Sequence, residues 1–147
     1  MSLIKRLLKS ILPTQSSPAP ISSGEQLARF IFSSNHIRST APRVRAGAFL
    51  PPPDLKLSVF RKSKMDLSYY ASIKSFIESD RKRRIKNTAL FSQDCLAALN
   101  LTAVPEETQH KWHADIEGWP TGTDKLEHKA RLKEVAGALA QQSVLEK

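Results

Sequence analysis

The segment HKWHADIEGW holds the densest group of side chains suited to acid–base or metal chemistry. If it forms a strand, His113, Asp115 and Glu117 share one face, while Ala114 and Ile116 share the other. An imidazole beside a carboxylate can transfer a proton or bind a divalent metal. The first and last polar side chains would lie about 13 Å apart along a strand, too far for one ion. We therefore expect no metal and no cofactor, and the competing interpretation is a solvated strand face.

A second histidine, His36, lies in the polar segment SSNHIRST among several arginines. With His113 as its partner and Asp115 nearby, it would supply an acid and a base for cleavage of a phosphodiester. Nothing in the sequence brings the two histidines together. A small phosphodiesterase, metal-independent or metal-dependent and of the toxin or defence-effector type, is therefore the alternative hypothesis, and the first hypothesis is non-enzymatic.

Basic residues are the strongest functional feature of the sequence. Five of the six residues in the run RKRRIK are cations, and consecutive helix positions point all round the axis, so several must face solvent or a partner. Two arginines alternate outward from a predicted strand at 43–50, and Arg61, Lys62 and Lys64 would extend the surface. The expected nucleic-acid-binding residues are Arg43, Arg45, Lys74, Arg81, Lys82, Arg83, Arg84 and Lys86.

The charge is concentrated in the first part of the chain. Residues 1–86 carry a net charge of +12 and residues 87–147 carry −3, which together give +9. Such asymmetry favours a polyanion or an acidic protein as the partner of the first part. The single cysteine, Cys95, excludes an internal disulfide and fits a buried residue of a cytoplasmic protein. No apolar run is long enough to predict a membrane-spanning helix.

Residues 1–20 are expected to form an amphipathic helix and a Pro/Ser-rich linker ahead of one compact domain, 21–147. Leu3, Leu7, Leu8 and Ile11 share the apolar face of this helix and are the expected residues for docking on a protein partner. Docking on its own domain, binding to an anionic membrane surface and a transit peptide are the alternatives.

The domain is expected to be α+β, with a small, mainly antiparallel sheet covered by helices on one face. Strands at 43–50 and 55–61 would pair with each other across a triple proline. The other expected elements are a helix opening near Ser22 with Leu27, Phe30 and Ile31 inward, a helix from Asp66 to about Lys86, a short helix around Cys95 ending at Asn100, strands at 101–104 and 112–119, and a final helix capped by Thr123 or Asp124.

The order RVRAGAFLPPP, LSVFR and HADIEGWP ahead of a terminal amphipathic helix resembles a group of small uncharacterised bacterial proteins. The resemblance covers residues 22–142 and implies a bacterial source and a single compact domain. It carries no established activity and transfers no functional residue. The sequence thus favours a basic accessory subunit of a bacterial complex that contacts the nucleic acid backbone or an acidic protein.

Overall fold

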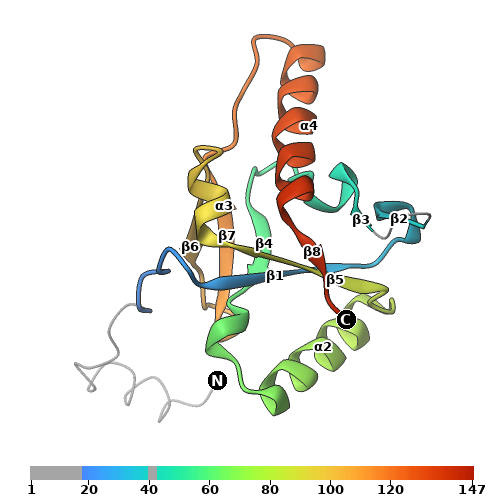
Figure 1. The fold of residues 1–147 in the computed structure, drawn as a ribbon, viewed down its shortest axis with the longest axis vertical. Coiled ribbons are helices and arrows are strands. Elements are labelled where there is room, and N and C mark those ends of the chain that lie inside the picture. The colour runs from blue at the N-terminus through green and yellow to red at the C-terminus, as the bar shows by residue number, and fades with distance from the viewer. Residues whose placement is uncertain (1–17, 40–42) are drawn as a thin grey trace.

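A six-stranded antiparallel sheet is the centre of the structure, a computed structural model that describes residues 18–39 and 43–147 (Figure 1). Its strand order is β6-β7-β4-β1-β5-β8, and α-helices pack against it, which confirms the predicted α+β class. A second sheet consists of β2 and β3. The elements are β1 (Gln26–Ile31), η1 (Ser34–His36), β2 (Ile37–Arg38), β3 (Arg43–Val44), η2 (Ala46–Phe49), β4 (Leu57–Phe60), η3 (Lys62–Lys64), α2 (Leu67–Arg81), β5 (Asn87–Ser92), α3 (Gln93–Ala97), β6 (Thr102–Pro105), β7 (His113–Glu117), α4 (Lys125–Gln142) and β8 (Val144–Leu145), where η marks a 3-10 helix.

The predicted N-terminal helix and most of the linker fall on residues 1–17, outside the described residues. The docking role of Leu3, Leu7, Leu8 and Ile11 therefore stays a prediction.

Helices cover both faces of the large sheet, where the sequence predicted helices on one face only. On one face, Leu27, Val59 and other inward residues of the strands form a core with Leu139 of α4. On the opposite face, Phe30 and Phe60 stack with ring centroids 5.3 Å apart and pack against α2. Figure 1 shows α4 and α2 on opposite sides of the sheet. The central strands are therefore buried on both sides.

This double burial explains why the helix predicted after Ser22 is wrong and the segment is β1. Leu27 and Ile31 lie in the larger core and Phe30 in the smaller one, so three buried positions imitate a helical period. The Ser22–Glu25 spacing marks a turn, in which the Glu25 N–H donates to the Ser22 carbonyl at 3.1 Å.

Strand β5 was not predicted, because its burial on both faces hides the alternation that marks a strand. The helix before it is also shorter than the predicted helix, which was expected to run to about Lys86. Helix α2 ends at Arg81, where Lys82 adopts a left-handed conformation with φ 53°. The chain then turns into β5, which pairs with the whole length of β1 from Gln26↔Ser92 to Ile31↔Asn87. Strand β1 thus lies between β4 and β5 in the sheet, and neither β1 nor β5 was predicted from the sequence.

The strand predicted at 43–50 is reduced to β3, and its predicted pairing with 55–61 is wrong. β3 pairs with β2, while β4 pairs with β1 and β7. After β3 the chain tightens into η2, which buries Phe49 against the larger core. Gly47 lies close to the His36 ring there, because a Cβ atom at this position would lie 2.7 Å from that ring and would displace it.

Other local predictions are confirmed. Asp66 caps α2 by accepting the Tyr69 N–H at 2.7 Å, and Asp124 caps α4 by accepting the Glu127 N–H at 2.8 Å. Asn100 adopts the expected left-handed conformation, with φ 59°, after α3. β6 and β7 form an antiparallel pair, as their sequence patterns allow.

The two long helices bury only some of their apolar side chains. Ile73 and Ile77 of α2 and Leu139 of α4 are buried in the two cores. Phe76 of α2 is 53% exposed and Leu126 of α4 is 81% exposed. The apolar pattern of each helix therefore extends beyond the residues that its core covers.

A buried ion pair fixes the start of the domain to the end of β4. The Arg61 guanidinium donates to Glu25 from Nε at 2.5 Å and from Nη2 at 2.9 Å. Nη1 donates to the Ala19 carbonyl at 2.7 Å. Both side chains are essentially inaccessible, so Arg61 cannot extend a phosphate-binding surface as the sequence suggested. Its role is to hold residues 18–25 against the sheet.

Replacing Glu25 with alanine should therefore be strongly destabilising, because it leaves the Arg61 charge buried without its partner. We expect a loss of about 3–5 kcal/mol in the free energy of unfolding, measured by urea denaturation. Glu25→Gln, which keeps the shape and part of the hydrogen bonding, should lose less. Glu134→Ala, on an exposed position of α4, is the control and should leave the free energy unchanged. Equal effects of Glu25→Ala and Glu134→Ala would contradict this role.

Candidate functional site

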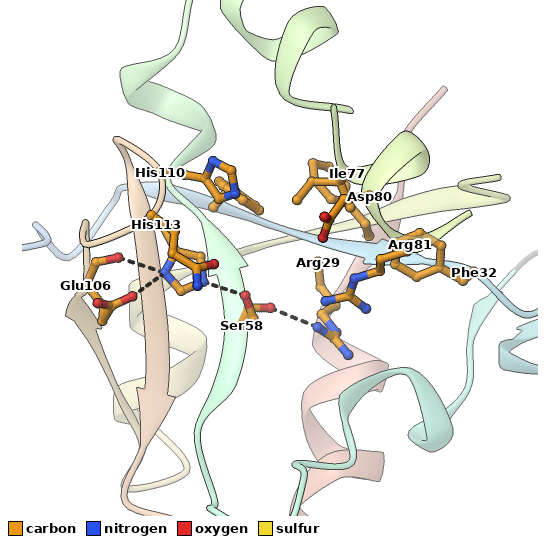
Figure 2. Close-up of a pocket in the computed structure, with 12 residues that line it drawn as sticks. Arg29, Phe32, Ser58, Ile77, Asp80, Arg81, Glu106, His110 and His113 are labelled. Carbon is orange, nitrogen blue, oxygen red and sulfur yellow. Dashed lines mark hydrogen bonds and ion pairs between the residues drawn. The ribbon is translucent and has the colours of Figure 1, made fainter. Parts of the chain in front are cut away.

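Strands β4 and β7 place a serine beside a histidine on the face that α2 covers. The register Ser58↔Asp115 and Phe60↔His113 puts Ser58 and His113 diagonally opposite each other on this face. Ser58 Oγ and His113 Nε2 are joined by a short hydrogen bond (Figure 2). The sequence predicted the orientation of His113 but did not identify Ser58 as its neighbour.

The other nitrogen of the His113 ring is held by Glu106, which follows β6. His113 Nδ1 lies 2.7 Å from the Glu106 carbonyl oxygen and 3.2 Å from its carboxylate Oε2. Both of these groups accept hydrogen bonds, so Nδ1 of the neutral ring carries the proton. Nε2 is then the acceptor, and the Ser58 hydroxyl donates to it. This is the arrangement of a serine with a base that a carboxylate orients.

Two carboxyl groups near His113 differ in their acidity. A hydrogen bond from the Thr108 hydroxyl lowers the pKa of Glu106, so this group is ionised at neutral pH. Burial raises the pKa of Asp115, whose Oδ1 lies 3.9 Å from His113 Nε2. The structure therefore brings the predicted pair of His113 and Asp115 together, but Glu106 is the carboxylate that orients the ring.

These side chains face a cavity of about 100 Å³ between the sheet and the end of α2. Phe30, Phe60 and Ile77 form much of its apolar wall. Its polar lining residues are Arg29, Ser58, Asp80, Arg81, Glu106, Gln109, His110 and His113.

Arg29 contributes a positive charge at the point where β1 separates from β4. Its Nε donates to the Ala48 carbonyl at 3.0 Å and its Nη1 donates to the Ser58 carbonyl at 2.9 Å. None of the acidic groups in 18–39 and 43–147 forms an ion pair with it. Burial, with the nearby charge of Arg81, lowers the pKa of Arg29 to about 10, so the guanidinium stays charged at neutral pH. Figure 2 shows the two arginines side by side at the cavity.

His36 lies outside this cavity, so the predicted pairing of His36 with His113 is not seen. Its ring packs against Gly47. Burial lowers the pKa of His36, and the charges of Arg29 and Arg83 lower it further.

The predicted basic residues divide into two groups. Lys74 forms an ion pair with Glu146 at 3.7 Å and lies over the Tyr70 ring, so it is already engaged. The others, together with Arg38, are exposed and lie in two segments, β2–β3 and the turn after α2. We call this group the basic end: Arg38, Arg43, Arg45, Arg81, Lys82, Arg83, Arg84 and Lys86.

Two observations indicate that the segments of the basic end lie near each other. Arg43 lines the same surface hollow as Asn87, the residue after Lys86, and the charge of Arg83 lowers the pKa of His36 in η1. Arg81 and Arg83 both lie over the Phe32 ring, at 5.0 Å and 5.6 Å from its centroid. In the described part of the chain, no ion pair engages any residue of the basic end.

Comparisons with known protein families, with curated proteins and with solved structures found no match. Within residues 18–39 and 43–147, no group of three or more His, Cys, Asp or Glu side chains is arranged to hold a metal ion. No helix in the same ranges is long and apolar enough to cross a membrane.

Arg29, Ser58 and Glu106 were not predicted as site residues from the sequence. Ser58 alternates with the inward residues of the strand LSVF, so its direction was readable, but the pairing of β4 with β7 was not. Arg29 was assigned to a helix. Glu106 lies in a polar loop, where only the β6–β7 pair brings it to His113.

The position of His36 predicts how stability depends on pH. Because the folded state lowers the pKa of this ring, the unfolded chain takes up the proton first, near its ordinary value of about 6.5. The free energy of unfolding should therefore fall as the pH drops through that value and level off below the folded pKa.

His36→Gln should remove this contribution and flatten the pH profile of the free energy of unfolding, measured by urea denaturation between about pH 5 and 8. Asn35→Ala, an exposed change in the same η1 helix, should keep the wild-type slope. Identical slopes in His36→Gln and the wild type would show that the ring titrates alike in both states.

Proposed function

We propose that this protein binds the phosphate backbone of nucleic acid through its basic end, as an accessory subunit of a bacterial complex in the cytoplasm. The observation that carries the proposal is the gathering of eight exposed cations from two segments that lie about 40 residues apart in sequence. No described acidic residue pairs with them. Cations that are free of internal partners can release the counterions of a phosphate backbone, which is the main source of backbone-directed affinity.

The way Arg81 and Arg83 are held supports the same function. Both guanidinium groups lie over Phe32, which restricts their freedom before a ligand binds. A guanidinium presents its donors in a fork that fits two phosphate oxygens. Recognition of this kind reads the backbone and not the bases, so we expect little sequence preference and strong dependence on salt.

An acidic protein is the other partner that a basic surface would fit. The regular spacing of phosphates along a strand matches a surface whose cations come from two neighbouring segments, which is why nucleic acid is favoured here. Binding to poly-glutamate but not to RNA or DNA at low salt would overturn this choice.

Charge reversal at the basic end tests the proposal. Arg83→Glu with Arg84→Glu should weaken binding to a mixed-sequence oligonucleotide at least tenfold at low salt, measured by fluorescence anisotropy. The slope of log affinity against log salt should fall by about 1.5, because two phosphate contacts are lost.

The matched control is Lys129→Glu with Lys133→Glu on the exposed side of α4, which changes the net charge equally. Only a small loss is expected from this control. Equal losses in both double variants would mean that net charge, and not this surface, determines binding.

A further inference from the structure

We propose that Ser58, His113 and Glu106 form a catalytic centre that cleaves a phosphodiester bond, with Ser58 as nucleophile, His113 as general base and acid, and Glu106 as the positioning residue. The choice of nucleic acid as substrate rests on the proposed function. The positions of the three side chains at the cavity do not depend on the proposed function.

The hydrogen bonds of the cluster give each group its role. The Ser58 hydroxyl donates to His113 Nε2, so the base is already hydrogen-bonded to the proton that the nucleophile must lose. Glu106 accepts from Nδ1 with its carbonyl at 2.7 Å and with its carboxylate at 3.2 Å, and thereby fixes both the tautomer and the direction of the ring. The side chains of Ser58 and His113 both line the cavity, where a substrate can reach them.

The charges in the cavity favour a phosphoryl group. Arg29 uses Nε and Nη1 to bind carbonyls, and the guanidinium keeps further N–H groups for an anion. Arg81 brings a second guanidinium to the same cavity. Two such groups can neutralise the oxygens of a phosphate in the transition state, and the apolar wall strengthens their effect by excluding water. Two carboxylates, Asp80 and Glu106, also line the cavity in the described structure, so the preference for a phosphoryl group comes from the neighbouring positions of Arg29 and Arg81 and not from an excess of positive charge.

The size of the cavity limits which part of a substrate can enter it. A volume of about 100 Å³ lies well below the roughly 300–1,000 Å³ of pockets that enclose a whole small molecule, so only a part of a substrate, such as a phosphate group, enters it. Arg81 belongs both to this cavity and to the basic end. A strand bound along the basic end would therefore place one phosphate at Arg81, with its sugars and bases outside.

The reaction needs only the phosphodiester and one water molecule. Ser58 Oγ attacks phosphorus and its proton passes to His113 Nε2. The bond from phosphorus to the leaving strand oxygen breaks, and His113 returns the proton to that oxygen, which gives a free hydroxyl end. The other strand end is now a diester of Ser58. Water, deprotonated by His113, attacks phosphorus, the Ser58 oxygen leaves and takes the proton, and the second product is a phosphomonoester.

The test uses the full chain with three substrates: end-labelled single-stranded RNA and DNA, and bis(4-nitrophenyl) phosphate, a small diester that does not need the basic end. We expect the wild type to hydrolyse the small diester and at least one strand. Ser58→Ala and His113→Ala should each lose about a hundredfold or more in rate while keeping their affinity for the strand. Ser75→Ala, an exposed serine of α2, should match the wild type.

Two further readouts separate catalysis from structure. A labelled strand should be found covalently attached to the peptide that contains Ser58 after rapid denaturation of the wild type, and this needs no variant to fold. Glu106→Gln should lower the rate and move the acidic limb of the pH–rate profile to lower pH, because its carboxylate no longer stabilises the protonated imidazole. A merely structural role for Glu106 would lower the rate without moving that limb.

The outcomes distinguish this inference from the proposed function. Strand binding by a wild type that cleaves no phosphodiester overturns the catalytic centre and leaves the basic end intact. Hydrolysis of the small diester without strand binding overturns the proposed function and supports the centre. Undiminished cleavage by Ser58→Ala excludes Ser58 as nucleophile. Turnover of 4-nitrophenyl acetate alone, dependent on Ser58, would mean acyl transfer and would overturn phosphodiester cleavage.

Discussion

The guanidinium of Arg29 occupies the place where β1 and β4 separate, and the arrangement around the cavity depends on it. The two strands pair only at Ala28↔Phe60. Beyond that point Arg29 joins them through the Ser58 carbonyl, and it also holds η2 through the Ala48 carbonyl. A buried carbonyl without a donor would be costly, so one side chain compensates for a gap in the sheet. The same side chain leaves a positive charge at the cavity that the gap creates.

This gap lies in a sheet that helices cover on both faces, and the site follows from that layering. The face toward α4 is filled by the larger core. The face toward α2 has a smaller core of Phe30, Phe60, Tyr70, Ile73 and Ile77, which does not extend over β7. The polar side chains of β4 and β7 therefore border a cavity instead of packed side chains. The basic end begins where α2 stops, so the cavity and the cationic surface share Arg81.

Features of the fold that depend on residues close together in the sequence could be predicted. The caps at Asp66 and Asp124, the strand at Leu57–Phe60 and the hairpin of β6 and β7 were readable because neighbours in sequence decide them. β1 and β5 were missed because burial on both faces removes the alternation that marks a strand. The candidate site needed the sheet register, which joins Ser58 to His113 across 55 residues, so its polar members were predicted only in part. The acidity of Glu106 and the burial of Arg61 depend on contacts that no sequence period encodes.

The central claim is that His113 is held in the tautomer that accepts the Ser58 proton. The most direct measurement is the side-chain nitrogen spectrum of ¹⁵N-histidine-labelled protein at mildly alkaline pH, with His113 assigned by comparison with His113→Ala. We predict a protonated Nδ1 and an unprotonated, hydrogen-bonded Nε2 whose resonance shifts in Ser58→Ala. A proton on Nε2, with Nδ1 bare, would contradict the account, because Ser58 would then accept a hydrogen bond and could not be activated.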